Sequence, residues 1–202
     1  MQPCLCEAWK YAEILFIAIL VILAEGALFV ISGSIAVGGD VMHTIVDSLG
    51  YLLPIGIAVA IYASKVIDEN LFRLRGGIAQ TALLFLVGVL IMVGGVYRLY
   101  VPSVINPLAM VLGGLVGVSG NLVMERMAHR FHDHATGRIL YLHVLADLII
   151  SGAVVTAGVA VYVTKIAAIE AFAAIAIGAY ITFWLAREAV QVTLEKHEHL
   201  RP

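Results

Sequence analysis

Residues 41–62, VMHTIVDSLGYLLPIGIAVAIY, form a long apolar run that contains one histidine and one aspartate, His43 and Asp47. A later apolar run contains His143 and Asp147 at the same four-residue spacing. On a helix this spacing places both side chains on one face, about 6 Å apart along the axis. An aspartate at membrane depth costs roughly 2.5–3.5 kcal/mol to insert. Because this costly residue is paired twice with histidine, the sequence predicts a metal site inside a membrane.

Six apolar runs occupy nearly the whole chain. The sequence has 202 residues, 62% of them hydrophobic, and a mean hydropathy of +1.02. Each run is close to the length of about 20 residues that a helix needs to cross the hydrocarbon core. We therefore expect an all-α integral membrane protein with six transmembrane helices, at 14–31, 41–62, 78–96, 104–124, 139–163 and 166–185.

The connections between these runs are short, so little of the chain remains for a separate soluble domain. We expect a cytoplasmic N-terminal segment at 1–12, a six-helix transmembrane domain at 13–190 and a short cytoplasmic tail at 191–202. The expected surroundings are a lipid bilayer, and we expect no nucleic-acid partner.

The basic residues are distributed unevenly between the two sets of connections. If the N-terminus is cytoplasmic, the outer segments hold only Arg98 and Lys165. The inner segments then hold ten basic residues, namely Lys10, Lys65, Arg73, Arg75, Arg126, Arg130, Arg138, Arg187, Lys196 and Arg201. This positive-inside bias predicts that both termini are cytoplasmic. Cys4 and Cys6 then face a reducing compartment, where we expect two free thiols, with a soft-metal contact as the alternative.

Two histidines and two aspartates supply a complete tetrahedral ligand set for a divalent ion. Mixed nitrogen and oxygen ligands disfavour Cu(I) and leave Zn²⁺, Co²⁺, Ni²⁺, Fe²⁺ and Mn²⁺ as candidates. The two carboxylates also neutralise the charge of the ion in a low dielectric. The alternative is that each pair forms only a hydrogen bond within its own helix, which is less favoured because the pair occurs on two separate helices.

Other polar residues in the membrane runs are candidate accessory groups. Glu25 is expected to face the bundle interior, either as a proton carrier or access-route group or as a hydrogen-bonding residue. Asp40, one turn before His43, either attracts cations or lies in water. Asn121 is expected to link helices. In the loop between the fourth and fifth runs, His129, His132, Asp133 and His134 either gather metal or form a solvated basic segment.

These motifs resemble those of the cation diffusion facilitator transporters. That family has an acidic residue in its first helix, then Ser-Gly-Ser-x-Ala, then Asp-x-x-His-x-x-x-Asp in its second helix, and His-Val-Leu-x-Asp in its fifth. The matching positions here are Glu25, Ser32-Gly33-Ser34-Ile35-Ala36, Asp40, His43, Asp47 and Leu142 to Asp147, with Asn121 at a common helix-four position. The likeness covers nearly the whole chain.

The resemblance implies a secondary transporter that exports divalent metal in exchange for protons, usually as a homodimer in the cell membrane. It implies a transport site made of His43, Asp47, His143 and Asp147, which is similar to the site of zinc-preferring members. Zn²⁺ is then the transported substrate and not a cofactor, with Cd²⁺, Fe²⁺, Mn²⁺, Co²⁺ and Ni²⁺ as alternatives.

The chain departs from the family pattern at three places. A tyrosine- and glycine-containing signature before the third helix is degraded at 72–77, and an Asp-Pro pair is missing around Ile169 and Glu170. The sequence also stops where the family's cytoplasmic domain ordinarily begins, so we expect a short form without that domain.

The competing hypothesis is an intramembrane zinc-dependent hydrolase that uses the same residues. A catalytic zinc ordinarily keeps three protein ligands and one position for water. Four available ligands leave no evident place for that water, so the sequence favours a transporter over an enzyme.

Overall fold

The structure is a computed structural model that describes residues 5–62, 69–128 and 135–198, with side chains over 9–52, 75–127 and 147–183 and at 55, 56 and 59. The described residues form six helices and no strand. The helices are α1 (Leu5–Ser32), α2 (Ile35–Tyr62), α3 (Glu69–Tyr100), α4 (Pro107–Ala128), α5 (Ala135–Thr164) and α6 (Ala168–Glu198). The predicted all-α class and the predicted number of helices are both confirmed.

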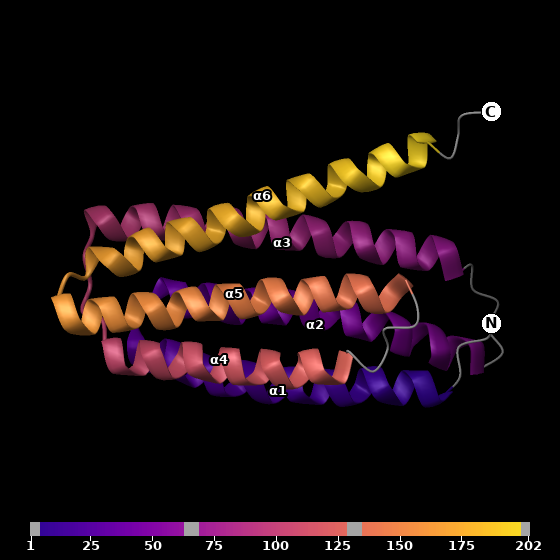
Figure 1. The fold of residues 1–202 in the computed structure, drawn as a ribbon, viewed down its shortest axis with the longest axis horizontal. Coiled ribbons are helices and arrows are strands. Elements are labelled where there is room, and N and C mark those ends of the chain that lie inside the picture. Colours follow the sequence, from indigo (N-terminus) through magenta and orange to yellow (C-terminus); the bar gives the residue numbers. More distant parts are fainter. Residues whose placement is uncertain (1–4, 63–68, 129–134, 199–202) are drawn as a thin grey trace.

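The six helices run lengthwise along one elongated bundle (Figure 1). The connections from α1 to α2, from α3 to α4 and from α5 to α6 lie together at one end, which we call the turn end. Helix α1 begins, and helix α6 finishes, at the opposite end, which we call the terminal end. The alternating direction of the helices, which the charge analysis assumed, is therefore present in the fold.

Helix α2 is the centre of the bundle, because it contacts each of the other five helices. Helix α5 packs against α2, α4 and α6, while α3 pairs with α6 and α1 pairs with α4. The two helices that carry the His-x-x-x-Asp pairs are thus direct neighbours, which the sequence pattern alone does not specify.

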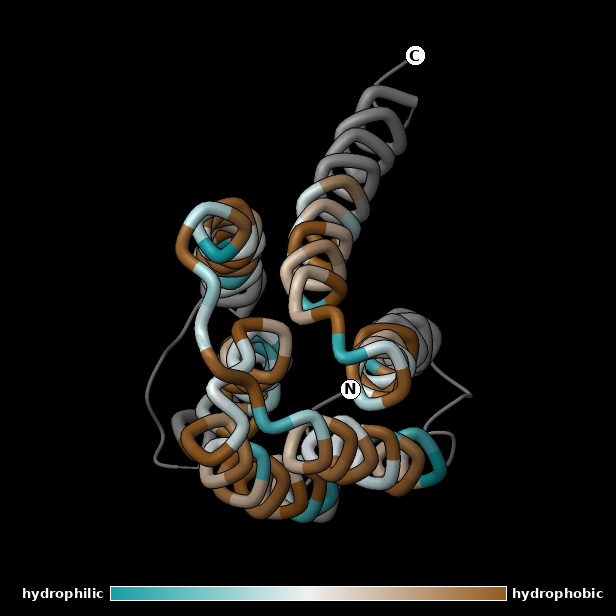
Figure 2. The backbone as a smooth tube through the Cα atoms, turned by 90° about the vertical axis from the view of Figure 1, so that its left-hand side faces the viewer, coloured by the Kyte–Doolittle hydropathy of each residue, from teal (hydrophilic) through white to brown (hydrophobic). Residues whose placement is uncertain are grey.

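Apolar side chains cover much of the outer surface. Leu23, Val30 and Phe183 are 66%, 77% and 71% exposed, and brown hydrophobic positions dominate the helices seen from the turn end (Figure 2). Within the described residues, four helices are long and apolar enough to span a membrane, at Trp9–Ser32, Arg75–Tyr100, Pro107–Met127 and Asp147–Thr164. Length and surface together define a multi-pass membrane protein.

All six helices begin at residues other than those predicted by apolarity, and hydrogen-bonded caps account for the starts of α2 and α4. Helix α2 begins at Ile35 and not at 41, because the Ser34 hydroxyl accepts a hydrogen bond from the Val37 amide at 3.3 Å and caps the helix. Helix α4 begins at Pro107 and not at 104, with Asn106 Oδ1 accepting from the Ala109 amide at 3.2 Å. In both cases the start is set by the side chain of the residue just before the helix, which a measure of apolarity does not register.

The turn between α1 and α2 is formed around Gly33, between Ser32 and Ser34. Gly33 has a φ of 63°, a left-handed conformation that glycine adopts without steric cost. Its amide donates to the Phe29 carbonyl at 2.9 Å, which closes α1. This tight reversal holds α1 and α2 side by side. It also fixes how far along the bundle the polar residues of the two helices lie relative to each other.

Candidate metal centre

The candidate metal centre lies where α2 meets α5, and three of the four predicted ligands meet there. His43 and Asp47 come from α2 and Asp147 comes from α5. All three are buried, with exposed fractions of 2%, 3% and 3%. The His43 Nε2 atom lies 2.7 Å from Asp147 Oδ1 and 3.1 Å from Asp47 Oδ2. One imidazole nitrogen therefore faces a carboxylate from each helix.

The contacts of His43 are not limited to a hydrogen bond within its own helix. Asp47 is the residue four positions along α2 from His43, but the shorter of the two contacts of Nε2 crosses to α5. The interpretation as an isolated intrahelical pair therefore does not describe the site, because His43 joins two helices through one ring nitrogen.

The spacing of the donor atoms fits a small divalent cation. One ligand atom from each of the three residues lies within 4.8 Å of the other two. Tetrahedral ligands at about 2.0–2.1 Å from zinc are separated by about 3.3 Å from one another. The two contacts of His43 Nε2, at 2.7 and 3.1 Å, need to widen by only a few tenths of an ångström to accept the ion.

The neighbouring hydroxyl groups on α2 donate hydrogen bonds to backbone carbonyls of the same helix and not to residues of the site. Thr44 Oγ1 donates to the Asp40 carbonyl at 3.0 Å and Ser48 Oγ donates to the Thr44 carbonyl at 2.7 Å. Such back-bonding to the preceding turn is a common resting place for hydroxyls in helices. On the polar face of α2, the ionisable side chains are therefore available to bind a ligand, whereas the hydroxyl groups are already hydrogen bonded.

The fourth predicted ligand, His143, belongs to α5, one helical turn before Asp147. Its side chain lies outside the described residues, so its role stays a prediction from the spacing on α5. The predicted loop residues His129, His132, Asp133 and His134 also lie outside the described residues, as do the side chains of the two N-terminal cysteines.

The predicted accessory residues Glu25 and Asp40 are both buried, with exposed fractions of 1% each. Glu25 faces the bundle interior as expected. The alternative that Asp40 lies in water is wrong, because the helices around α2 enclose that side chain. Asn121 is confirmed as a link between helices, since its Nδ2 donates to Ser151 Oγ at 3.1 Å and joins α4 to α5.

A second polar centre at the turn end was not predicted from the sequence. Glu170, in the first turn of α6, is fully buried, and its Oε1 accepts hydrogen bonds from Ser34 Oγ and from the Ala36 amide, both at 3.0 Å. Its Oε2 lies 3.8 Å from Arg98 Nε, and Arg98 also donates to the Gly33 carbonyl. Glu170 therefore ties α6 to the start of α2 and to the end of α3.

One sequence signal points to this centre. Arg98 is one of the two outer basic residues, and Glu170 stands where the Asp-Pro pair of the similar transporters is missing. A lone outer arginine and a lone outer glutamate near the ends of two apolar runs are candidates for a pair, although nothing local shows that α3 and α6 are neighbours.

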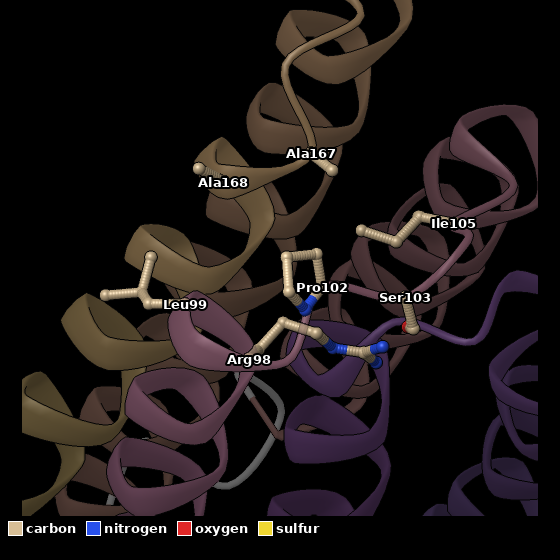
Figure 3. A pocket seen from close by; sticks show the side chains of 7 residues that line it. All are labelled: Arg98, Leu99, Pro102, Ser103, Ile105, Ala167 and Ala168. Carbon is tan, nitrogen blue, oxygen red and sulfur yellow. The ribbon is translucent and has the colours of Figure 1, made fainter.

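Beside Arg98 lies a small cavity at the turn end, lined by Arg98, Leu99, Pro102, Ser103, Ile105, Ala167 and Ala168 (Figure 3). Its volume is about 40 Å³. Sites for organic ligands occupy about 300–1,000 Å³, so this cavity accommodates water and not a metabolite.

The fold and the site together define a multi-pass, all-helical membrane protein with a buried cluster of one histidine and two aspartates, a candidate ligand set for a divalent cation. A family model described as the cation efflux transmembrane domain matches residues 13–195. The chain belongs to this cation efflux family, whose members are transporters, so the resemblance drawn from the motifs is confirmed. No curated protein matches the chain. The family supports divalent cation transport across a membrane as the class of function.

Proposed function

We propose that this protein is a secondary transporter that exports divalent cations from the cytoplasm in exchange for protons, with Zn²⁺ as its preferred substrate. The proposed transport site consists of His43, Asp47, His143 and Asp147. The observation that supports it is the placement of His43 Nε2 between one carboxylate of α2 and one of α5, buried at the centre of a membrane bundle.

Zinc is favoured over the other candidates by the donor set. Imidazole nitrogen and carboxylate oxygen at tetrahedral spacing suit Zn²⁺, whereas Mn²⁺ prefers more oxygen ligands and a larger coordination number. Cd²⁺, Fe²⁺, Co²⁺ and Ni²⁺ are secondary substrates on this proposal, since each accepts imidazole and carboxylate.

The same geometry supports the proposal of proton exchange. When the cation is absent, a proton on His43 Nε2 satisfies the facing carboxylates by hydrogen bonding. When the cation binds, it takes the place of that proton, because a ligating imidazole nitrogen carries no hydrogen. A single position thus holds either a proton or a metal ion, which is the condition for exchanging one against the other.

Transport requires the site to open alternately to each side. Because Asp147 belongs to α5 and His43 to α2, a relative movement of these two helices alters the ligand set itself. We propose that both termini are cytoplasmic in the cell membrane, so that the terminal end is the loading side and the turn end is the release side. We further propose a homodimer, with residues 13–190 as the transport domain.

The decisive experiment is a flux measurement in proteoliposomes with an imposed pH gradient. With Zn²⁺ outside and the lumen acidic, we expect Zn²⁺ uptake in the fraction of molecules that load from outside, together with alkalinisation of the lumen. Asp147→Asn removes one anionic ligand and is expected to reduce the flux to the level of empty liposomes. Glu13→Gln, an exposed site on α1, is the matched control and is expected to leave the flux unchanged.

Two results would contradict the proposal in different ways. Zinc uptake that does not respond to the pH gradient would remove proton exchange but leave transport. Uptake by Asp147→Asn at the rate of the unaltered protein would remove the site assignment. Parallel assays with Cd²⁺, Mn²⁺, Fe²⁺, Co²⁺ and Ni²⁺ rank the substrates.

A further inference from the structure

Two buried carboxylates outside the transport site carry oxygen atoms that nothing in the described structure satisfies. Both side-chain oxygens of Glu25, and Oδ2 of Asp40, are buried without a hydrogen-bond partner among the described residues. The two carboxyl groups interact electrostatically with each other. A buried polar group without a partner loses its hydration and gains nothing in return. Two such carboxyl groups side by side are stabilised either by a shared proton or by a cation.

Neutral oxygen atoms complete this cluster. Asn121 Oδ1 is also buried and without a partner among the described residues, while its Nδ2 is held by Ser151 Oγ. Asp40 interacts by side-chain hydrogen bonding with Ser151 as well as with Glu25. The oxygen atoms come from four different helices, namely α1, α2, α4 and α5.

Gly117 on α4 provides the space in which these oxygens converge. A Cβ atom built on Gly117 would fall against Glu25 Oε1 and within 2.6 Å of Ser151 Oγ. The glutamate from α1 and the serine from α5 therefore approach the same point on α4, and the absence of a side chain at Gly117 lets both of them pack against this helix.

The cluster is displaced from the metal centre in one direction only. On α2, Asp40 precedes His43 by three residues, and on α5, Ser151 follows Asp147 by four. Because α2 leads away from the turn end and α5 leads toward it (Figure 1), both displacements are toward the turn end. Each is about 5–6 Å along its helix, which is one turn.

We propose that Glu25, Asp40, Asn121 and Ser151 form a second divalent-cation site, made of oxygen ligands alone, one helical turn from the His43 centre on its turn-end side. The proposal rests on the proposed function in one respect, that the ion held there is the transported cation. Two carboxylates balance the charge of the ion, and the absence of imidazole makes the site weaker for Zn²⁺ and relatively better for Mn²⁺. An ion leaving His43 toward the turn end would meet these oxygens next.

The test is the binding of Mn²⁺ and Zn²⁺ to the purified full chain in lipid nanodiscs, measured by equilibrium dialysis. We expect two classes of divalent site per chain, one of which prefers Zn²⁺ and one of which accepts Mn²⁺ with a smaller preference for Zn²⁺. Glu25→Gln is expected to weaken the second class at least tenfold while leaving the first within twofold. Glu13→Gln on the same helix is the control and is expected to change neither.

A second pair of variants tests the space without removing any ligand. Gly117→Ala is expected to weaken the second class at least tenfold, because the added methyl group occupies the point where Glu25 and Ser151 converge. Gly152→Ala is the matched control, since a Cβ atom there meets no atom within 4 Å. Retained binding of Zn²⁺ to the first class shows in each variant that the fold is intact.

The outcomes separate this proposal from the proposed function. His43→Ala is expected to abolish the first class and to leave Mn²⁺ binding at the second. If His43→Ala leaves the first class unchanged, the assignment of the transport site fails while the second site is judged by Glu25→Gln alone. A single class of site in the unaltered protein, or Mn²⁺ binding that Glu25→Gln and Gly117→Ala leave unchanged, overturns the second site.

Discussion

His43 is the residue on which the proposed chemistry depends. Its Nε2 atom is 2.7 Å from a carboxylate of α5 and 3.1 Å from a carboxylate of α2, so a proton or a cation at that nitrogen bridges the two helices. A charge at this point is held between two anions in a buried environment, where attraction is screened less than at a surface.

The binding of Zn²⁺ at this site is expected to depend on pH in a definite direction. Loading needs a neutral imidazole and ionised carboxylates, so protons are released and the apparent affinity increases as the pH rises. Calorimetry at one pH in two buffers of different ionisation enthalpy measures the number of protons released. Equal heats in both buffers would show that no proton leaves, and proton exchange at the site would then be wrong.

The second histidine offers a test at the same scale. If His143 completes a tetrahedral set, His143→Ala and His43→Ala are each expected to lower the Zn²⁺ affinity by more than roughly 100-fold, because each removes one of four ligands. Competition against a fluorescent zinc chelator measures both. A loss confined to His43→Ala would leave the site with three protein ligands and exclude His143.

At the scale of the element, Glu170 acts as a cap supplied from another helix. Its carboxylate satisfies the Ser34 hydroxyl and the Ala36 amide at the start of α2, where the helix dipole favours an anion. Glu170→Ala leaves these donors and Arg98 without their anion and is expected to reduce the free energy of unfolding by about 2 kcal/mol. Thermal unfolding in detergent measures the change, with Glu13→Ala as the exposed control. Equal melting temperatures for the two variants would contradict this role.

Close packing between α3 and α6 depends on a small residue. A Cβ atom on Gly178 would lie 2.8 Å from the Met92 amide nitrogen, so the two backbones approach each other closely here. Gly178→Leu is expected to destabilise the protein by about 1–3 kcal/mol through overpacking. Gly152→Leu, at a position with no atom near its Cβ, is the control. Similar melting temperatures for both variants would show that this contact adapts to a larger side chain.

At the scale of the whole molecule, the bundle has two distinct ends, and their orientation in the membrane is a prediction from charge. The start of α1 and the end of α6 lie at the same end, and the basic residues are concentrated in the segments assigned to that side. We expect a reporter fused to either terminus to be active only in the cytoplasm. If the two reporters agree with each other but face outward, the fold stands and the direction of transport reverses.

Much of the molecule was predictable from local sequence. The apolar runs indicated six helices because crossing the bilayer sets a length for each. The pairing of His43 with Asp47 follows from a spacing of four residues on one helix. The starts at Ile35 and Pro107 differed from the apolar runs because the cap residues Ser34 and Asn106 set them.

The sequence by itself determined the membrane class, the number of helices and three candidate ligands that the structure brings together, because periodicity, run length and residue type are local properties. Only the tertiary structure decided that Asp147 of α5 meets His43 of α2, that Asp40 is enclosed and that Glu170 binds the start of α2. These contacts join residues about a hundred positions apart, so they depend on which helices pack together and at what height. Helix packing depends on the shapes of whole helix faces, so it cannot be predicted from any short stretch of sequence.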